Sequence, residues 1–340
     1  MTRVGAERQA RIRQTLEHLR NGTTDEAPDV VTFGAREFTD VEIARREREL
    51  VFGRVPSVIA SSGELPGPAD FIARQMPRHR VAVFRGEDGA VQALGDTPAG
   101  PVELPVEERH GLIWIVDAVG APIDVAAWLG PEMDRVLAGY RLEDLVTFRA
   151  EGFDEPANWK IMQDAFIDNY HIAYAHPNSA AKHVHTNVQT VEDFGRHARM
   201  TSARKSLDRW LDEEPGDRDL SLYVTDGHFL LPNSTLLRQP DDHYELLTFR
   251  PHPRGPGWCR MEMRLLVPAL EVSGKEPAKW QRTWEKNWAI LLQVLHEEDF
   301  PLLRQSQAAL ASSDAAGMVL GRNEVVNQIF HREIRKLMAS

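Results

Sequence analysis

The sequence is almost without cysteine, because Cys259 is the single thiol among 340 residues. One thiol cannot form an intrachain disulfide, and it cannot complete a metal site built from several cysteines. An iron–sulfur cluster carried by this chain alone is therefore excluded. Cys259 stands in the segment GPGWCRMEMRLLV, at the start of an expected strand, where a packed thiol is the simplest interpretation.

Positive charge and long apolar runs are also scarce. Lys and Arg number 40 against 51 Asp and Glu, which gives a formal net charge of −11. Phosphate binding needs clustered Lys and Arg, so this balance argues against a nucleic-acid partner. No stretch reaches the roughly eighteen apolar residues of a membrane span, and the start MTRVGAERQARIRQTLEHLRNG lacks the apolar centre of a signal peptide. We therefore expect a cytoplasmic protein with no membrane partner.

Changes in composition and in hydrophobic pattern along the chain predict three parts. Residues 1–50 read as a charged helical arm, residues 51–125 as a small β-rich unit, and residues 126–340 as a larger domain. Within the small unit, RVAVFRGEDGAVQAL predicts a hairpin that turns at Glu87-Asp88-Gly89, and HGLIWIVDAV predicts a further strand. With 42% hydrophobic residues, the chain can form one large core and a smaller one.

Periodic segments predict the main helices and the main sheet. Residues 157–176 carry apolar side chains at three- and four-residue spacing, which is typical of a helix. Residues 276 to about 310 predict a long amphipathic helix, in which Trp280, Trp284 and Trp288 form a core face. Between about 222 and 270, three β-patterned segments bounded by Pro, Gly, Asn or Asp predict a curved antiparallel sheet.

The segment DAFIDNYHIAYAHP carries the chemistry, with His171 and His176 five residues apart and Asp168 three residues before the first. Two neutral imidazoles and one carboxylate on one face of a metal leave positions open for dioxygen and suit ferrous iron. On an unbroken helix the two histidines point about 140° apart, so both bind one ion only if the helix distorts or ends between them. Pro177 supplies a reason, because the residue before a proline is pushed out of the α region.

With the preceding NWK, this segment resembles the signature of the catalytic α-subunits of Rieske non-haem iron ring-hydroxylating oxygenases. The resemblance implies that His171 and His176 bind Fe(II), with Asp299 of HEEDFPLLRQSQAAL as the third ligand. It also implies that Asp168 is the carboxylate that bridges toward the iron–sulfur cluster of a neighbouring subunit. Similarity in EIARRERELVFGRV, HFLLPNSTLL and GRNEVVNQIFHREI extends the resemblance over nearly the whole chain.

The implied fold is α+β. It consists of a helix-grip (Bet v 1-like) catalytic domain with a curved antiparallel sheet at 126–340, and a truncated Rieske-type β domain at 51–125. The chain departs from the family in two ways. It has neither the C-x-H nor the C-x-x-H loop that holds a Rieske cluster, since QALGD continues through TPAGPV to ELPVEERHGLIWI. It also has Ala165 where the family places an asparagine near the metal.

The implied function is oxidation of a small, aromatic organic molecule by iron-activated O2, with electrons from a separate partner. That partner is expected to be a Rieske protein, a reductase bearing such a cluster, or a cluster-containing paralogue in a homo- or heteromeric trimer or hexamer. Expected pocket walls are the helix bearing Asp299 and four sheet residues, His228, Phe229, Leu231 and Asn233.

Several alternatives stay open. The same metal site suits an enzyme that needs no external electrons, either a non-redox lyase, isomerase or hydrolase or an oxidation that draws its electrons from the substrate. A further alternative is that the chain is a non-catalytic subunit that supports an active paralogue. For Asp168, the alternative is a role as a simple hydrogen-bond partner of a ligand imidazole. His183 and His185 are interpreted as surface residues or as residues that support the site.

Overall fold

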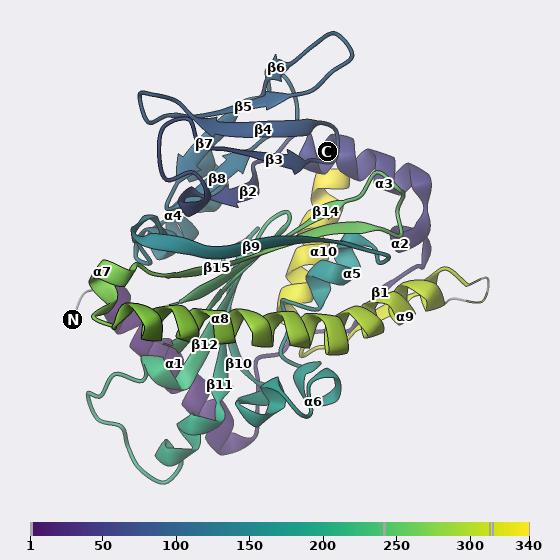
Figure 1. The fold of residues 1–340 in the computed structure, drawn as a ribbon. Coiled ribbons are helices and arrows are strands. Elements are labelled where there is room, and N and C mark those ends of the chain that lie inside the picture. Colours follow the sequence, from purple (N-terminus) through teal and green to yellow (C-terminus); the bar gives the residue numbers. More distant parts are fainter. Residues whose placement is uncertain (1–2, 241–242, 313, 315, 340) are drawn as a thin grey trace.

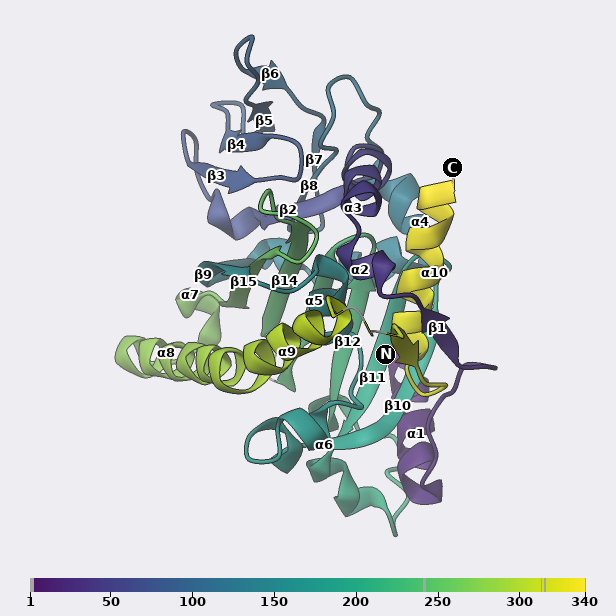
Figure 2. The same cartoon turned by 90° about the vertical axis from the view of Figure 1, so that its right-hand side faces the viewer.

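A seven-stranded antiparallel sheet forms the centre of the computed structural model, which describes residues 3–240, 243–312, 314 and 316–339 (Figures 1 and 2). The strand order is β10-β11-β12-β13-β14-β15-β9. The strands span Val184–Asp193 (β10), Ala198–Arg204 (β11), Val224–Leu230 (β12), Ser234–Arg238 (β13), Tyr244–Pro251 (β14), Cys259–Pro268 (β15) and Leu145–Glu155 (β9). The predicted sheet at about 222–270 is confirmed as β12–β15. The other three strands were not predicted.

The small unit between residues 57 and 115 has two sheets of its own. One has the order β2-β8-β7 and the other the order β3-β4-β5-β6. The predicted hairpin is confirmed as β4 and β5, and the predicted further strand as β8. The strands span Ser57–Ser61 (β2), Phe71–Gln75 (β3), Arg80–Arg85 (β4), Val91–Gly95 (β5), Val102–Glu103 (β6), Val106–Arg109 (β7) and Leu112–Ile115 (β8). Short turns join β5 to β6 through residues 96–101 and β6 to β7 through residues 104–105.

Helices cover both faces of the large sheet. They span Arg3–Asn21 (α1), Arg36–Thr39 (α2), Val41–Glu47 (α3), Val125–Ala138 (α4), Trp159–Asp164 (α5), Ile172–Ala175 (α6), Leu270–Ser273 (α7), Pro277–Val294 (α8), Phe300–Leu310 (α9) and Val325–Ala339 (α10). Two short strands, Val31–Phe33 (β1) and Met318–Leu320 (β16), pair beside them. No helix within the described ranges is both long and apolar enough to cross a membrane.

Strand alternation gives the large sheet two apolar faces. The first face carries Gly227, Leu237 and Leu247, with Gly227 opposite Leu237 and Leu247 opposite Thr235. This face packs under α5, α8, α9 and α10. The opposite face carries Leu236 and Leu246, and it packs against α4 and the small β unit. Figure 2 shows α8 on the side of β9 and β15, and α10 toward β10 and β11.

Both predicted helices are interrupted close to the residues that were expected to bind the metal. The helix expected over 157–176 consists of α5 and the single turn α6, with an irregular segment between them. The helix expected from 276 to about 310 continues from α8 into α9 through a π-helical turn at Leu295–Asp299. Such turns insert an extra residue and often mark functional sites. The predicted core face is confirmed, since Trp284 and Trp288 are buried and Trp280 is half-buried against the same core.

The NWK sequence, residues 158–160, holds α5 against the N-terminal arm through hydrogen bonds and an ion pair. Asn158 caps α5 by accepting from the Lys160 backbone N–H, while its own amide donates to the Phe38 carbonyl at 3.1 Å. The Trp159 indole donates to Glu47 at 2.8 Å, and the Lys160 ammonium pairs with the same carboxylate. The Lys160 and Glu47 side chains are only 3% and 2% exposed, so water cannot replace either partner.

We predict that Lys160→Met destabilises the fold by about 3–5 kcal/mol, because it leaves the Glu47 carboxylate buried without a cation. Urea unfolding followed by circular dichroism measures this change. Arg45→Met is the matched control, because Arg45 pairs with Glu42 and Glu49 on the exposed surface of the same arm. A Lys160 variant as stable as the Arg45 variant would show that the pair does not hold the arm.

Two buried histidines are neutral, and each ring donates a hydrogen bond from one nitrogen and accepts one at the other. His228 donates from Nδ1 to the Leu236 carbonyl at 3.0 Å and accepts at Nε2 from the Tyr140 hydroxyl at 2.8 Å. His197 donates from Nε2 to the Trp128 carbonyl at 3.0 Å and accepts at Nδ1 from the Leu231 N–H at 3.1 Å. Burial lowers the pKa of His228 to about 3 and that of His197 to about 4.

These histidines predict a loss of stability in mild acid. Their folded pKa values lie below the unfolded value of about 6.5, so their contribution is complete above that pH. It should fall by on the order of a few kcal/mol as the pH drops from about 6.5 toward 4. Urea midpoints at several pH values measure the slope. His197→Gln can keep both hydrogen bonds without titrating, so an equally steep slope in that variant would rule out His197 as a source.

Candidate metal centre

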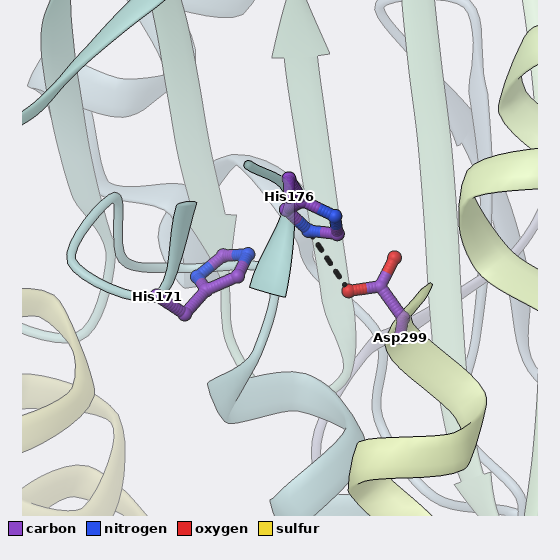
Figure 3. Close-up of side chains that lie close together, drawn as sticks. All are labelled: His171, His176 and Asp299. Atoms are coloured by element: carbon purple, nitrogen blue, oxygen red, sulfur yellow. Dashed lines mark ion pairs between the residues drawn. The ribbon is translucent and has the colours of Figure 1, made fainter. Parts of the chain in front are cut away.

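Three predicted residues converge on one point in the structure. His171 directly precedes α6, His176 directly follows it, and Asp299 ends the π-helical turn between α8 and α9. One ligating atom from each lies within 4.8 Å of the other two (Figure 3). His176 leaves the helical region at φ −121° and ψ 42°, which lets its ring turn toward His171. The two rings lie 5.1 Å apart between centroids.

His171 is oriented by Asp168. One carboxylate oxygen, Oδ1, accepts from the His171 backbone N–H at 3.0 Å and lies 3.2 Å from its ring Nδ1. Burial disfavours protonation of the ring, but the charge and hydrogen bond of Asp168, together with the charge of Asp299, outweigh it and raise the pKa of His171. With Nδ1 donating to Asp168, the opposite nitrogen Nε2 is free to bind a metal.

His176 lies between two carboxylates. Its Nδ1 is 2.6 Å from Glu298 Oε2, and its Nε2 is 3.1 Å from Asp299 Oδ1. The Ser179 hydroxyl also donates to Glu298, at 2.5 Å. Burial opposes protonation of the ring, but the two carboxylates raise the pKa of His176. Sequence reasoning missed Glu298, although it directly precedes Asp299 and the π-helical turn brings both toward one ring.

The donor set fits a divalent metal. Metal–ligand bonds of about 2.0–2.2 Å place neighbouring ligand atoms roughly 3–4 Å apart, so the observed spacing closes with small side-chain movements. Two imidazoles and one carboxylate leave coordination positions open, and Asp168 and Glu298 hold the outer nitrogens of both rings. Asp168, Glu298 and Asp299 together place more negative charge around the two rings than neutral imidazoles can balance. A bound cation would compensate it.

His183 and His185 lie apart from this group. Among the side chains that the structure describes, the one cluster of three or more potential ligands is His171, His176 and Asp299. His183 is exposed and lines the nearby cavity. The Nε2 atom of His185 is 2.6 Å from Oδ1 of Asp208.

A cavity of about 540 Å³ opens beside the three converging residues. Its floor is the first face of the large sheet, and α8 and the π-helical turn form one wall. Ala165 lines it, at the position where an asparagine was expected from the resemblance. The lining is mainly apolar and includes Phe166, Met200, Leu237, Leu247, Met263 and Leu291.

The four sheet residues expected in the pocket wall lie elsewhere. His228 faces the opposite side of the sheet from Gly227, because side chains alternate along β12. Phe229 packs on Phe330 of α10, with ring centroids 5.3 Å apart. Leu231 is buried in the core, and the Asn233 amide donates to the Val58 carbonyl at 3.3 Å. The sheet instead presents Thr225, Gly227, Leu237, Glu245 and Leu247 to the cavity.

Comparison with solved structures identifies the fold over nearly the whole chain. The quaternary ammonium Rieske monooxygenase CntA in complex with L-carnitine superposes with a TM-score of 0.70 and 18% identity, over 91% of this chain and 96% of that one. Naphthalene 1,2-dioxygenase from Rhodococcus sp. bound to indole gives a TM-score of 0.67 and 14% identity, over 98% of each chain. At such identities the likeness establishes the shared fold alone, and it confirms the predicted fold class.

Comparison with curated protein sequences found no significant match. Residues 142–340 do match the family described as "Ring hydroxylating alpha subunit (catalytic domain)". This region contains α5, α6, the large sheet and the π-helical turn, and so all three converging residues. The chain therefore belongs to the ring hydroxylating alpha subunit family of non-haem iron oxygenases and is an oxidoreductase.

Proposed function

We propose that this chain binds one Fe(II) through His171, His176 and Asp299 and oxygenates a small organic, aromatic substrate in the adjoining cavity. The convergence of these three side chains at the cavity wall carries the proposal. When bound, ferrous iron supplies the chemistry that activates dioxygen. The residues around it have separate tasks. Asp168 and Glu298 hold the ligand imidazoles in one tautomer, and the apolar lining excludes water from the substrate.

The electrons come from a separate partner in this proposal. Oxygenation consumes an electron pair beyond those that the substrate supplies, and one cysteine cannot hold the cluster that normally provides them. We further infer that residues 51–125 are a Rieske-type domain without cluster loops. The short turns between β5, β6 and β7 support this inference. The donor is then a Rieske protein, a cluster-bearing reductase or a paralogue in a shared oligomer.

Asp168 is the proposed point of electron entry. Its Oδ1 is used by His171, whereas its Oδ2 accepts no hydrogen bond from any residue that the structure describes. Beside it, the rings of Tyr170 and Tyr174 form a pair at 5.3 Å and are 42% and 72% exposed. Exposed aromatic side chains of this kind are common at protein interfaces. The free oxygen and the tyrosine pair together suit a docking face for the donor.

We predict that Glu298→Gln weakens Fe(II) binding by about 10–100-fold, because the ligand His176 loses the carboxylate that orients it. Anaerobic titration with Fe(II), followed by metal analysis, measures the affinity and the expected stoichiometry of one metal per chain. His176→Ala should abolish binding.

Glu297→Gln is the matched control for this prediction. Glu297 is the preceding residue of the same turn, but its carboxylate is exposed and accepts from Gln293. Equal effects of the two glutamate variants would show that charge alone, not orientation of His176, determines affinity. Full metal binding by the His176 variant would refute the ligand assignment.

We predict that Asp168→Asn retains the metal but lowers donor-driven product formation by orders of magnitude. Peroxide brings oxygen already carrying the required electrons, so a peroxide-driven reaction should be affected far less. Oxygen consumption and product formation are measured with a Rieske-containing reductase system and, separately, with peroxide.

The contrast between the two assays separates electron entry from simple support of His171, which would lower both rates together. If the wild-type protein turns over without any reductant and Asp168→Asn is harmless, the partner-fed oxygenase is excluded. The alternative would then be an enzyme that needs no external electrons.

A further inference from the structure

The cavity contains one buried carboxyl group that the proposed iron chemistry does not use. Glu245 lies on β14 opposite Leu237, so it points from the first sheet face into the cavity, and it is 8% exposed. At the cavity-facing positions of β12–β15, all of which the structure describes, it is the one carboxyl group among apolar and small residues. A carboxyl group in such a place costs free energy unless it meets a partner.

The protein partners of Glu245 satisfy only part of its hydrogen-bonding capacity. The Gln239 amide donates to Oε1 at 3.2 Å, and the Thr225 hydroxyl donates to the Gln239 oxygen at 3.3 Å. These two successive hydrogen bonds orient the Gln239 amide so that its N–H points toward Glu245. Oε2 receives no hydrogen bond and no ion pair from the described part of the chain. Burial raises the pKa of Glu245 to about 7, as expected for a carboxyl without a cation.

Permanently charged cations are scarce in the described part of the cavity lining. No arginine occurs among the described residues that line it, and the one lysine, Lys182, is exposed. Asp168 and Asp299 add further negative charge. A substrate carboxylate would therefore meet repulsion and lose its hydration without compensation. A protonated amine would instead give Glu245 the cation it lacks.

We propose that Glu245 is the specificity-determining residue of the cavity and binds the N–H groups of an amine substrate, whose apolar body lies against the sheet and α8. This inference deepens the proposed function, on which it rests, by naming the substrate class. The charged end of the substrate is held by Glu245 Oε2, with Gln239 fixing the other carboxyl oxygen. Phe166, Leu237 and Leu247 provide apolar surface for the remainder.

The test compares three ligands with the same naphthalene body on the full-length protein. These are 1-naphthylmethylamine, uncharged 1-methylnaphthalene and anionic 1-naphthoate. Equilibrium dialysis under anaerobic conditions measures their dissociation constants with and without Fe(II). We expect the amine to bind at least about tenfold more tightly than 1-methylnaphthalene, the gain from one charge-assisted hydrogen-bonded pair. Naphthoate should bind most weakly.

Glu245→Gln should remove the preference for the amine and strengthen naphthoate binding. Glu245→Met, which avoids a buried polar group, should bind 1-methylnaphthalene more tightly than the wild type. Glu285→Gln is the control, because it removes the same charge from the exposed side of α8. An amine preference that is absent in the wild type, or that survives in both Glu245 variants, would overturn the proposal.

The binding measurement separates this inference from the proposed function. The amine preference is read without turnover and also in metal-free protein, so it remains measurable if Fe(II) does not bind at the three ligands. Conversely, Fe(II) binding and donor-driven turnover can succeed while the ligand series shows no role for Glu245.

Discussion

Buried charge must be paired, and this constraint determines how the chain is assembled. The Lys160–Glu47 pair fixes the N-terminal arm to the helix that precedes the metal centre. On the far face of the sheet, Glu262 lies between Arg250 and Arg264, and Arg264 also donates to the small β unit at the Ile59 carbonyl. The structure thus joins segments far apart in sequence at points where an unpaired charge would be most costly.

The candidate metal centre is subject to the same constraint, but there the cation that would balance the buried carboxylates is not a side chain. Two imidazoles are surrounded by Asp168, Glu298 and Asp299, an excess of negative charge that suits a divalent cation. Glu245, which lines the same cavity, accepts a hydrogen bond on one carboxyl oxygen only. Both features place uncompensated negative charge where a ligand can reach it, whereas the structural pairs are closed to water. This difference separates the residues proposed to bind a metal or a substrate from the residues that stabilise the fold.

The division of labour proposed for this oxygenase also has a physical basis. The catalytic domain keeps the residues that hold and orient the ligand imidazoles, while the small β unit has short turns between β5, β6 and β7. The small unit still has an apolar core and packs on α4 and the sheet, so it stabilises the fold without a cluster. A small β unit without cluster ligands is therefore compatible with the convergence of His171, His176 and Asp299, because the two parts depend on different buried contacts.

The amino-acid sequence predicted the family, the β12–β15 sheet, the tryptophan face of α8 and the convergence of His171, His176 and Asp299. The sheet and the tryptophan face follow from local periodicity, and the two histidines belong to one short motif. Asp299 is distant in sequence and was expected only from the family resemblance. The sequence did not predict the break before His171, the π-helical turn, the role of Glu298 or the residues that line the cavity. Which face of a strand meets the cavity depends on register and on the helices packed over it, and both are set by contacts between distant segments.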